Sequence, residues 1–200
     1  MYKFGRFLCW VYCGFFIRLK VSGKENIPKK GGFVLASNHI SYLDPLVLGF
    51  ACPRDLNFMA KEELFRNRFF GGMIRSVGAF PVKRKTADLS AIKEAVKRVR
   101  SGKGLVLFPE GGRGDGLELG KPEAGIGFIT AKAQAPVIPV FIKGTEQALA
   151  KGSRSMRHAK VSVVFGKQIS VERKMPYQDT AQLIMDNIRH LGISPVLSGV

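Results

Sequence analysis

Short apolar runs alternate with amphipathic segments along most of this chain. A continuous apolar run bounded by turn residues is typical of a strand that is buried on both faces of a sheet. Such runs lie at residues 33–36, 56–60, 77–82, 105–108, 137–142 and 161–165. Segments that favour helices lie between or after them, at residues 46–51, 86–100, 123–134 and 179–191. This alternation predicts an α/β fold in which a largely parallel or mixed central sheet is flanked by helices.

Residues 86–100 have the clearest helical periodicity. The predicted apolar stripe consists of Leu89, Ile92, Val96 and Val99, with basic side chains on the opposite face. Thr86 is the predicted N-cap of this helix and Gly102 its predicted stop.

The amino-terminal segment has a different pattern. Residues 7–17 form an apolar run rich in aromatic side chains, with Lys and Arg on both sides of it. As a helix this run would span about 16 Å, roughly half of the ~30 Å hydrocarbon core of a bilayer. Aromatic side chains and basic flanks favour a helix that lies among lipid headgroups. Residues 1–20 are therefore predicted to form an interfacial membrane-binding helix, the alternative being a helix packed on the protein's own core.

The rest of the chain, residues 21–200, is short enough to be a single α/β domain. Its formal net charge of +17 predicts attraction to polyanions, which include nucleic acids, anionic membranes and phosphorylated substrates. The three cysteines form no CxxC pair and the histidines do not cluster, so no metal site is expected and a reducing cytoplasm is favoured. Nucleic-acid binding is disfavoured because helix-turn-helix, zinc-finger and RNA-binding aromatic signatures are missing.

Candidate chemistry begins where the first apolar run ends, at Asn38-His39-Ile40-Ser41-Tyr42-Leu43-Asp44-Pro45. The carboxyl end of a strand in an open α/β sheet is where such folds place their binding sites. His39 is a candidate general base, and Asp44 a candidate for the group that orients its ring. Asp44 before Pro45 also fits a helix N-cap followed by proline at the first helical position. Both roles are compatible, because a carboxylate accepts several hydrogen bonds.

A glycine-rich loop follows the strand predicted at residues 105–108. In Phe108-Pro109-Glu110-Gly111-Gly112-Arg113-Gly114 the glycines allow backbone N–H groups to face an anion. Arg113 is a candidate phosphate ligand, and Glu110 is a candidate to accept hydrogen bonds from hydroxyls or to orient that arginine. The Lys-Ser/Thr ending of a Walker loop is missing. The alternative is an exposed loop whose arginine is solvated.

Basic residues follow two other predicted strands, Lys61 in one case and Lys83 with Arg84 in the other. Because carboxyl ends of parallel strands share an edge, these side chains are candidates to line the crevice that contains His39. His158 and His190 are predicted to be solvated.

The order of these pieces resembles the four blocks of the glycerolipid acyltransferases. The blocks are NHISYLDP, KEEL with GAFPVKR, FPEGGRG and VIPVFIKGT, and the resemblance covers residues from about 23 to 166. The bacterial 1-acyl-glycerol-3-phosphate (lysophosphatidate) acyltransferase group is the nearest in pattern. Two departures stand out: the family usually has threonine and serine where this chain has Gly112 and Gly114, and a Phe-Lys-Lys-Gly pattern where it reads GKPEAG.

The resemblance implies a glycerol-3-phosphate acyltransferase-like fold and acyl transfer from a thioester to lysophosphatidate, without a covalent enzyme intermediate. It implies that His39 is the general base and Asp44 its orienting residue. The acceptor-binding residues that it implies are Lys61, Arg84, Glu110, Gly111 and Arg113.

No cofactor is expected beyond the co-substrate, acyl-CoA or acyl-acyl carrier protein. The expected partners are the lysophospholipid, the donor and a membrane surface, with no nucleic acid. The expected location is the cytoplasmic face of the cell membrane, as a peripheral or monotopic protein.

Three questions stay open at this point. The acceptor is lysophosphatidate or another lysolipid, since Gly112 and Gly114 replace hydroxyl residues. A non-catalytic basic protein that binds membranes or nucleic acid is the more distant alternative. A backbone N–H near Gly111 or in the His39 turn is the candidate oxyanion donor.

Overall fold

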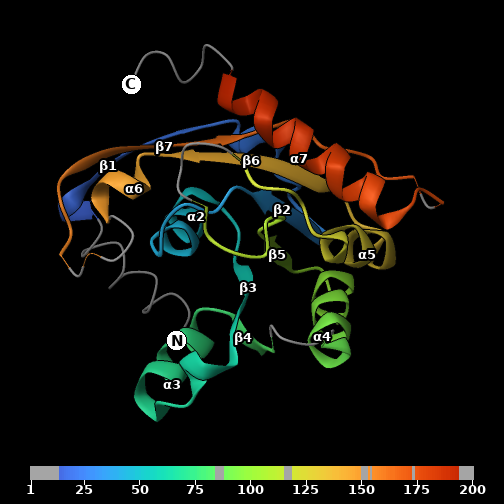
Figure 1. Cartoon of the computed structure of the whole chain (residues 1–200), viewed down its shortest axis with the longest axis horizontal. Coiled ribbons are helices and arrows are strands. Elements are labelled where there is room, and N and C mark those ends of the chain that lie inside the picture. The colour runs from blue at the N-terminus through green and yellow to red at the C-terminus, as the bar shows by residue number, and fades with distance from the viewer. Residues whose placement is uncertain are drawn as a thin grey trace.

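The computed structural model describes residues 14–83, 88–114, 119–149, 153, 155–172 and 174–193. Within these residues, seven strands form one sheet in the order β1-β7-β6-β2-β5-β3-β4 (Figure 1). The strands are β1 (Ile17–Ser22), β2 (Phe33–Ser37), β3 (Leu56–Lys61), β4 (Ala79–Val82), β5 (Gly104–Leu107), β6 (Val137–Lys143) and β7 (Ala159–Phe165). The predicted α/β class with a central sheet is confirmed.

The sheet is mixed. β6, β2, β5, β3 and β4 pair in parallel, whereas β7 runs antiparallel to β6 and parallel to β1. The carboxyl ends of five strands therefore lie at one edge, which we call the catalytic edge. Because β1 runs in the opposite direction, its first residue, Ile17, also lies at this edge.

Helices cover both faces of the sheet. One face packs against α2 (Asp44–Ala51), and the other packs against α4 (Leu89–Arg100), α5 (Ala124–Ala133) and α7 (Tyr177–Ile193) (Figure 1). β2 shows why both faces need covering, since Phe33 and Leu35 join one core cluster and Val34 and Ala36 join the other. Each large aliphatic side chain buried in this way contributes about 1.5–3 kcal/mol.

Short elements complete the chain. They are the 3-10 helices η1 (Lys24–Asn26) and η2 (Glu62–Phe65) and the helices α3 (Arg68–Ser76) and α6 (Thr145–Ala148). In the parts of the chain that the structure describes, no helix has the length and apolar character needed to cross a bilayer.

The prediction of an amino-terminal helix over residues 1–20 is wrong at its carboxyl end. Residues 1–13 lie outside the described residues, residues 14–16 are helical, and Ile17 begins β1. The sequence Ile-Arg-Leu-Lys-Val-Ser alternates apolar and polar side chains, which is the period of a strand. Its lysine and arginine also suit an edge strand, where charge opposes pairing with another chain.

The helix predicted at residues 86–100 is confirmed with a shifted register. Its N-cap is Asp88, whose side chain accepts from the N–H groups of Ser90 and Ala91, and Thr86 lies outside the described residues. Leu89 is 62% exposed, and the buried stripe consists of Ala91, Ala95 and Val99. The stop is confirmed at Gly102, whose φ of 87° places it in the left-handed region that favours glycine.

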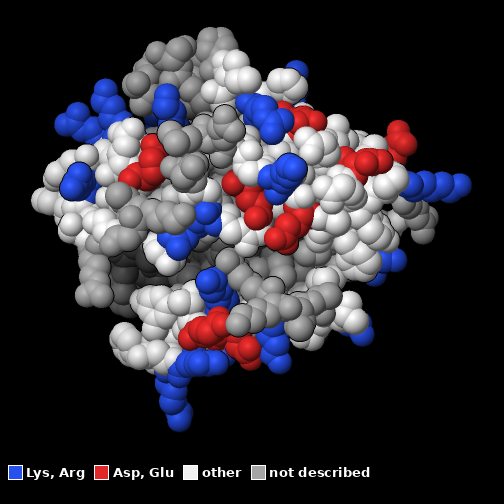
Figure 2. Space-filling view, in the orientation of Figure 1, with Lys and Arg blue, Asp and Glu red and all other residues white. Residues whose placement is uncertain are grey.

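Positive charge is spread over the molecule. Figure 2 shows Lys and Arg side chains at the upper, central and lower parts of the visible face, with acidic side chains among them. This face therefore carries no single basic stripe of the kind that follows a nucleic-acid backbone.

Candidate active site

Segments from three strands meet at the catalytic edge. His39 follows β2, Phe108 follows β5, and Thr145 follows β6. Asn38 joins two of these strands beyond their last ladder bond, because its side chain donates to the carbonyl of Ile142 and accepts from the N–H of Ile142, both at 2.8 Å. The buried amide therefore extends the pairing of β2 with β6 and fixes the start of the His39 turn.

His39 and Asp44 form a hydrogen-bonded pair. The Nδ1–H of His39 donates to Oδ2 of Asp44 at 2.8 Å, and the Asp44 side chain is fully buried. The same oxygen accepts from the backbone N–H groups of Ile40 at 2.7 Å and Ser41 at 2.8 Å. A carboxylate oxygen has no proton to donate, so Nδ1 is assigned as the donor of this bond, and in the neutral tautomer this leaves Nε2 as the nitrogen that can accept a proton.

The second oxygen of Asp44 has its own partner. Thr145 Oγ1 donates to Oδ1 of Asp44 at 2.6 Å, and Thr145 is fully buried. It is placed there by Gly144, whose φ of 93° turns the chain directly after β6. A Cβ at position 144 would lie 2.1 Å from the carbonyl oxygen of Lys160, so the turn requires glycine.

The alternative role of Asp44 as a helix N-cap is wrong. α2 has Leu43 at its N-cap position, and no side chain caps it. The carboxylate instead accepts from amides of the turn that precedes the helix. Asp44 still stands in the first helical turn, where negative charge is favoured by the helix dipole.

The ring of His39 lies against an aromatic side chain and faces a cavity. It stacks on Phe108 with ring centroids 4.0 Å apart and an interplanar angle of 19°. The cavity has a volume of about 690 Å³ and reaches from His39 to the glycine loop. Its apolar lining consists of Met59, Val82, Ile92, Val106, Leu107, Phe108, Ile126 and Ile129. His39, the candidate base, therefore lies beside a cavity with a largely apolar lining.

The glycine loop is tied to the His39 turn in both directions. The N–H of His39 donates to Oε1 of Glu110 at 3.2 Å, and the N–H of Gly114 donates to the carbonyl of His39 at 2.8 Å. Oε2 of Glu110 accepts from the N–H of Gly120 at 3.2 Å. The Glu110 carboxylate therefore holds the backbone of the His39 turn and of Gly120 in place. In the same loop, the Arg113 guanidinium lies over the ring of Tyr42, 3.4 Å from its centroid.

Gly111 has a left-handed backbone conformation that favours glycine. Its φ is 63°, and a Cβ there would lie 2.3 Å from a carboxylate oxygen of Glu123. Both residues line the cavity.

The remaining predicted residues lie around this site. Lys61 is the exposed last residue of β3 at the catalytic edge, and Lys83 lines the cavity. Arg84 lies outside the described residues. His158 and His190 are exposed, as predicted.

Asp88 brings a negative charge to the rim of the cavity. Hydrogen bonds from the Ser90 hydroxyl and from the N–H groups of Lys83 and Ala91 lower its pKa from 3.8 to about 2. Within the described ranges, no group of three or more His, Cys, Asp or Glu residues is placed to hold a metal ion.

Four of the backbone N–H groups near Gly111 and in the His39 turn, where an oxyanion donor was predicted, are already hydrogen-bonded. The N–H of Gly111 donates to the carbonyl of Phe108, and those of His39, Ile40 and Ser41 donate to carboxylates. These four amides are therefore not free to stabilise an oxyanion.

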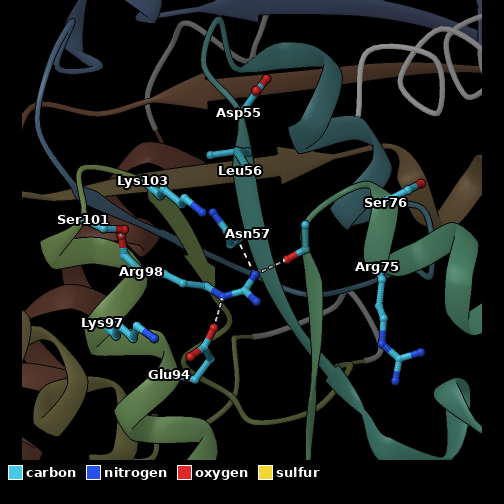
Figure 3. A pocket seen from close by; sticks show the side chains of 11 residues that line it. Asp55, Leu56, Asn57, Arg75, Ser76, Glu94, Lys97, Arg98, Ser101 and Lys103 are labelled. Atoms are coloured by element: carbon cyan, nitrogen blue, oxygen red, sulfur yellow. Dashed lines mark hydrogen bonds and ion pairs between the residues drawn. The ribbon is translucent and has the colours of Figure 1, made fainter. Parts of the chain in front are cut away.

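A second cavity, of about 530 Å³, lies at the opposite ends of the strands, near the starts of β3 and β5 (Figure 3). The Arg98 guanidinium is fixed there, since it donates to Glu94 at 2.7 Å, to Asn57 Oδ1 at 2.7 Å and to the carbonyl of Gly78 at 3.1 Å. It also lies over the ring of Phe80. Arg98 therefore joins α4 to two strands, and the pairing lowers the pKa of Glu94.

Three residues of the site could not be assigned from sequence. Phe108 ends one of the apolar runs, Thr145 stands three positions after the end of another, and Asn38 reads as an ordinary strand end. The available signal was position alone, since Phe108 opens the FPEGGRG block and Thr145 closes the VIPVFIKGT block.

Residues 18–143 match the family model described as Acyltransferase. The 1-acyl-sn-glycerol-3-phosphate acyltransferase of Bacillus subtilis strain 168 is 31% identical over 153 residues, which is 76% of this chain and 73% of the relative. The protein of the same name from Streptococcus pneumoniae is 33% identical over 150 residues, which is 74% of this chain and 54% of the relative.

One solved structure supports the fold. The crystal structure of the 1-acyl-sn-glycerophosphate acyltransferase PlsC from Thermotoga maritima superposes with a TM-score of 0.79 at 23% identity, covering 96% of this chain and 80% of that chain. The family model and the Bacillus subtilis relative confirm the family indicated by the four sequence blocks, and the chain belongs to the acyltransferase family.

Proposed function

We propose that this acyltransferase moves a fatty acyl group from a thioester to the 2-hydroxyl of 1-acyl-glycerol-3-phosphate, making phosphatidate for phospholipid synthesis. The observation that carries this proposal is the His39–Asp44 pair, bonded at 2.8 Å and facing a largely apolar cavity. The names of the Bacillus subtilis and Streptococcus pneumoniae relatives support the choice of acceptor.

The reaction needs one base and no protein nucleophile. Nε2 of His39 takes the proton from the acceptor hydroxyl as its oxygen attacks the thioester carbonyl carbon. The C–S bond then breaks, and the imidazolium returns the proton to the departing thiolate. Asp44 keeps the ring oriented and stabilises the imidazolium, as the third member of a triad does. General-base catalysis of this kind contributes about 10²- to 10⁴-fold to a rate.

Basic side chains bind the acceptor phosphate in this proposal. Arg113 is held beside the His39 turn, since its guanidinium lies over the ring of Tyr42. Lys61 and Arg84 are the further candidates. An arginine held on an aromatic face keeps donors available for bidentate contact with phosphate. Glu110 and Gly111 shape the loop that carries Arg113.

The cavity beside His39 accommodates an acyl chain. A volume of about 690 Å³ with an apolar lining lies in the range of small-molecule sites. Ile126 and Ile129 line the same cavity as His39, so an acyl chain bound against them would share that cavity with the imidazole.

The donor is acyl-CoA or acyl-acyl carrier protein, and no other cofactor is proposed. The expected surroundings are the cytoplasmic face of the cell membrane, with the segment before β1 and the positive charge holding the protein there. Nucleic acid is not a proposed partner.

Mass-spectrometric product analysis tests the function. Purified protein should convert lysophosphatidate and a thioester donor to phosphatidate, with acyl-CoA and acyl-acyl carrier protein assayed separately. His39→Ala should lower turnover by about 10²-fold or more while leaving the melting temperature close to that of the unsubstituted protein. Turnover close to normal in this variant would overturn the mechanism.

Parallel reactions with lysophosphatidylcholine, lysophosphatidylglycerol and lysophosphatidylethanolamine test the acceptor. Preference for one of these would replace lysophosphatidate as the acceptor, and Gly112 and Gly114 would then be the first positions to restore to Thr and Ser.

A further inference from the structure

Helix α3 turns its apolar side chains outward. Phe69 is 87% exposed, Met73 46% and Phe70 41%, and Leu64 of the preceding η2 is 42% exposed. We call these four residues the α3 apolar face. In the helix itself the buried residue is Gly71. A soluble helix ordinarily directs its apolar stripe towards the core, so this orientation indicates a contact outside the domain.

The helix is nevertheless well formed. The side chain of Asn67 caps it by accepting from the N–H of Phe70 at 2.9 Å. Gly71 lets it approach η2 closely, since a Cβ there would lie 2.9 Å from the carbonyl oxygen of Phe65. The exposed side chains are therefore presented on an ordered element.

Basic residues border the α3 apolar face. Arg66 and Arg68 are exposed at the start of the helix, and the Arg75 guanidinium lies 4.7 Å from the centroid of the Phe65 ring. Arg75 points away from the Arg98 network in Figure 3. Figure 2 shows Lys and Arg side chains projecting from the lower end of the molecule, where Figure 1 places α3, with acidic side chains beside them.

The start of α3 lies towards the catalytic edge, and the helix then runs back towards the start of β4, where Arg75 and Ser76 line the second cavity. η2 follows the carboxyl end of β3, so it leaves the sheet at the catalytic edge. The segment before Ile17 enters the sheet at the same edge, through β1. β1 and β4 are the two outer strands, so the two aromatic and basic segments flank the site that contains His39.

We propose that the α3 apolar face inserts into the headgroup region of an anionic bilayer and is a second membrane contact beside the amino-terminal segment. The exposed phenylalanines supply the apolar part of such a contact, and Arg66 and Arg68 supply attraction to anionic lipid. The inference rests on the proposed function, because a lipid acceptor gives the protein a reason to hold its catalytic edge at a bilayer.

A tryptophan reporter tests the insertion directly. The chain has one tryptophan, Trp10, so Phe69→Trp in a Trp10→Phe background makes position 69 the only indole. With vesicles of phosphatidylcholine and phosphatidylglycerol that contain brominated acyl chains, this indole should be quenched. Ser101→Trp in the same background is the control, because Ser101 is exposed and lines the second cavity at the opposite ends of the strands, so an indole there should stay unquenched. Equal quenching at both positions, or none at position 69, would overturn the proposal.

Vesicle flotation measures the contribution to binding. Phe69→Gln with Met73→Gln should weaken the binding of the full chain by about tenfold or more, as expected for loss of buried aromatic and aliphatic surface. Leu89→Gln should weaken binding less, because it removes one exposed apolar side chain outside the α3 apolar face. Arg66→Gln with Arg68→Gln should weaken binding to anionic vesicles more than Lys93→Gln with Lys97→Gln, which removes the same charge from α4.

A monomeric acceptor distinguishes the membrane contact of α3 from the proposed acyl transfer. Turnover of a short-chain, monomeric acceptor should be unchanged by Phe69→Gln with Met73→Gln, because these residues lie outside the cavity lining. Loss of that turnover would show that the α3 apolar face takes part in substrate binding or catalysis. A lipid-free dimer that the same substitutions dissociate would make the face an interface between copies. Either result would overturn the membrane contact, while absence of turnover in the unsubstituted protein would overturn the function alone.

Discussion

At the scale of single residues, Asp44 is the centre of the site. Its carboxylate accepts four hydrogen bonds, from the His39 ring, two backbone amides and the Thr145 hydroxyl. A buried carboxylate with this many donors stays in one orientation, and the imidazole takes its direction from it. Asp44 therefore connects the first and the last sequence block of the site.

Thr145 is accordingly predicted to be a positioning residue. Thr145→Val removes the donor to Asp44 Oδ1 and leaves a buried carboxylate oxygen without a partner, which should cost about 1.5–3 kcal/mol of unfolding free energy. We expect kcat to fall by up to about 100-fold with KM little changed, because a misplaced base slows the chemical step. Steady-state kinetics and thermal melts measure the two effects.

Thr145→Ser is the control for this substitution. Serine keeps the hydroxyl and should restore most of kcat. If Thr145→Val lowered stability without lowering kcat, the residue would be structural and its positioning role would be contradicted.

The sequence identified which residues carry candidate chemistry, but it did not reveal most of their hydrogen-bond partners. His39 and Asp44 were predictable because an imidazole and a carboxylate stand five positions apart after a buried strand. The role of Glu110 was not, because its contacts are with backbone N–H groups of His39 and Gly120, which leave no trace in side-chain chemistry. Thr145 acts 101 positions away from Asp44, and only the fold brings them together.

At the scale of elements, the pairing of β2 with β6 depends on a side chain. Asn38→Leu leaves the N–H and carbonyl of Ile142 buried without partners, at a cost of about 1–3 kcal/mol for each group. We therefore expect a clear fall in the urea midpoint. Asn187→Leu is the control, because the Asn187 side chain donates only to a carbonyl one turn earlier in α7. A midpoint equally affected by both substitutions would contradict the bridging role.

The cap of α4 gives a prediction about pH. The pKa of Asp88 is about 2 in the folded protein and 3.8 ordinarily, so the carboxylate stabilises the fold above pH 3.8. This contribution is lost as the pH falls from 3.8 through about 2, because the folded state must then take up the proton. Asp88→Ala should lower the melting temperature at neutral pH, and Asp88→Asn should lower it less, since asparagine also caps helices.

Melting curves across this pH range provide the measurement. The difference between the unsubstituted protein and Asp88→Asn should shrink as the pH approaches 2. A difference that stays constant with pH would show that the charge of Asp88 contributes nothing beyond the cap.

Elements with strong periodicity were predictable and the edge strand was not. The runs that became β2, β5, β6 and β7 are apolar because both faces of the central sheet are covered. β1 alternates apolar and basic residues directly after an aromatic run, so its first four residues, 17–20, were counted with the preceding helix. Leu89 was assigned to the core of α4 because periodicity alone does not fix which of two adjacent stripes faces the sheet.

At the scale of the whole molecule, strand direction gathers the function at one edge. Five parallel strands place the His39 turn, the glycine loop, Lys61, Lys83 and Thr145 at this edge, while β1 brings the amino-terminal segment to the same edge from the opposite direction. A sheet with its crevice at the carboxyl ends of its strands can therefore face a bilayer with the site between its outer segments.

The net charge of +17 gives this arrangement a dependence on salt. Raising the ionic strength from about 0.05 M to about 0.5 M shortens the range of charge attraction severalfold, so binding to anionic vesicles should weaken. Turnover of a short-chain monomeric acceptor should fall less than turnover of acceptor embedded in vesicles, because the first requires phosphate binding alone and the second also requires membrane attraction. Flotation and product analysis at matched salt concentrations measure the two. Equal loss with both acceptors would place the salt effect at the phosphate site and contradict a role of the overall charge in holding the enzyme at the membrane.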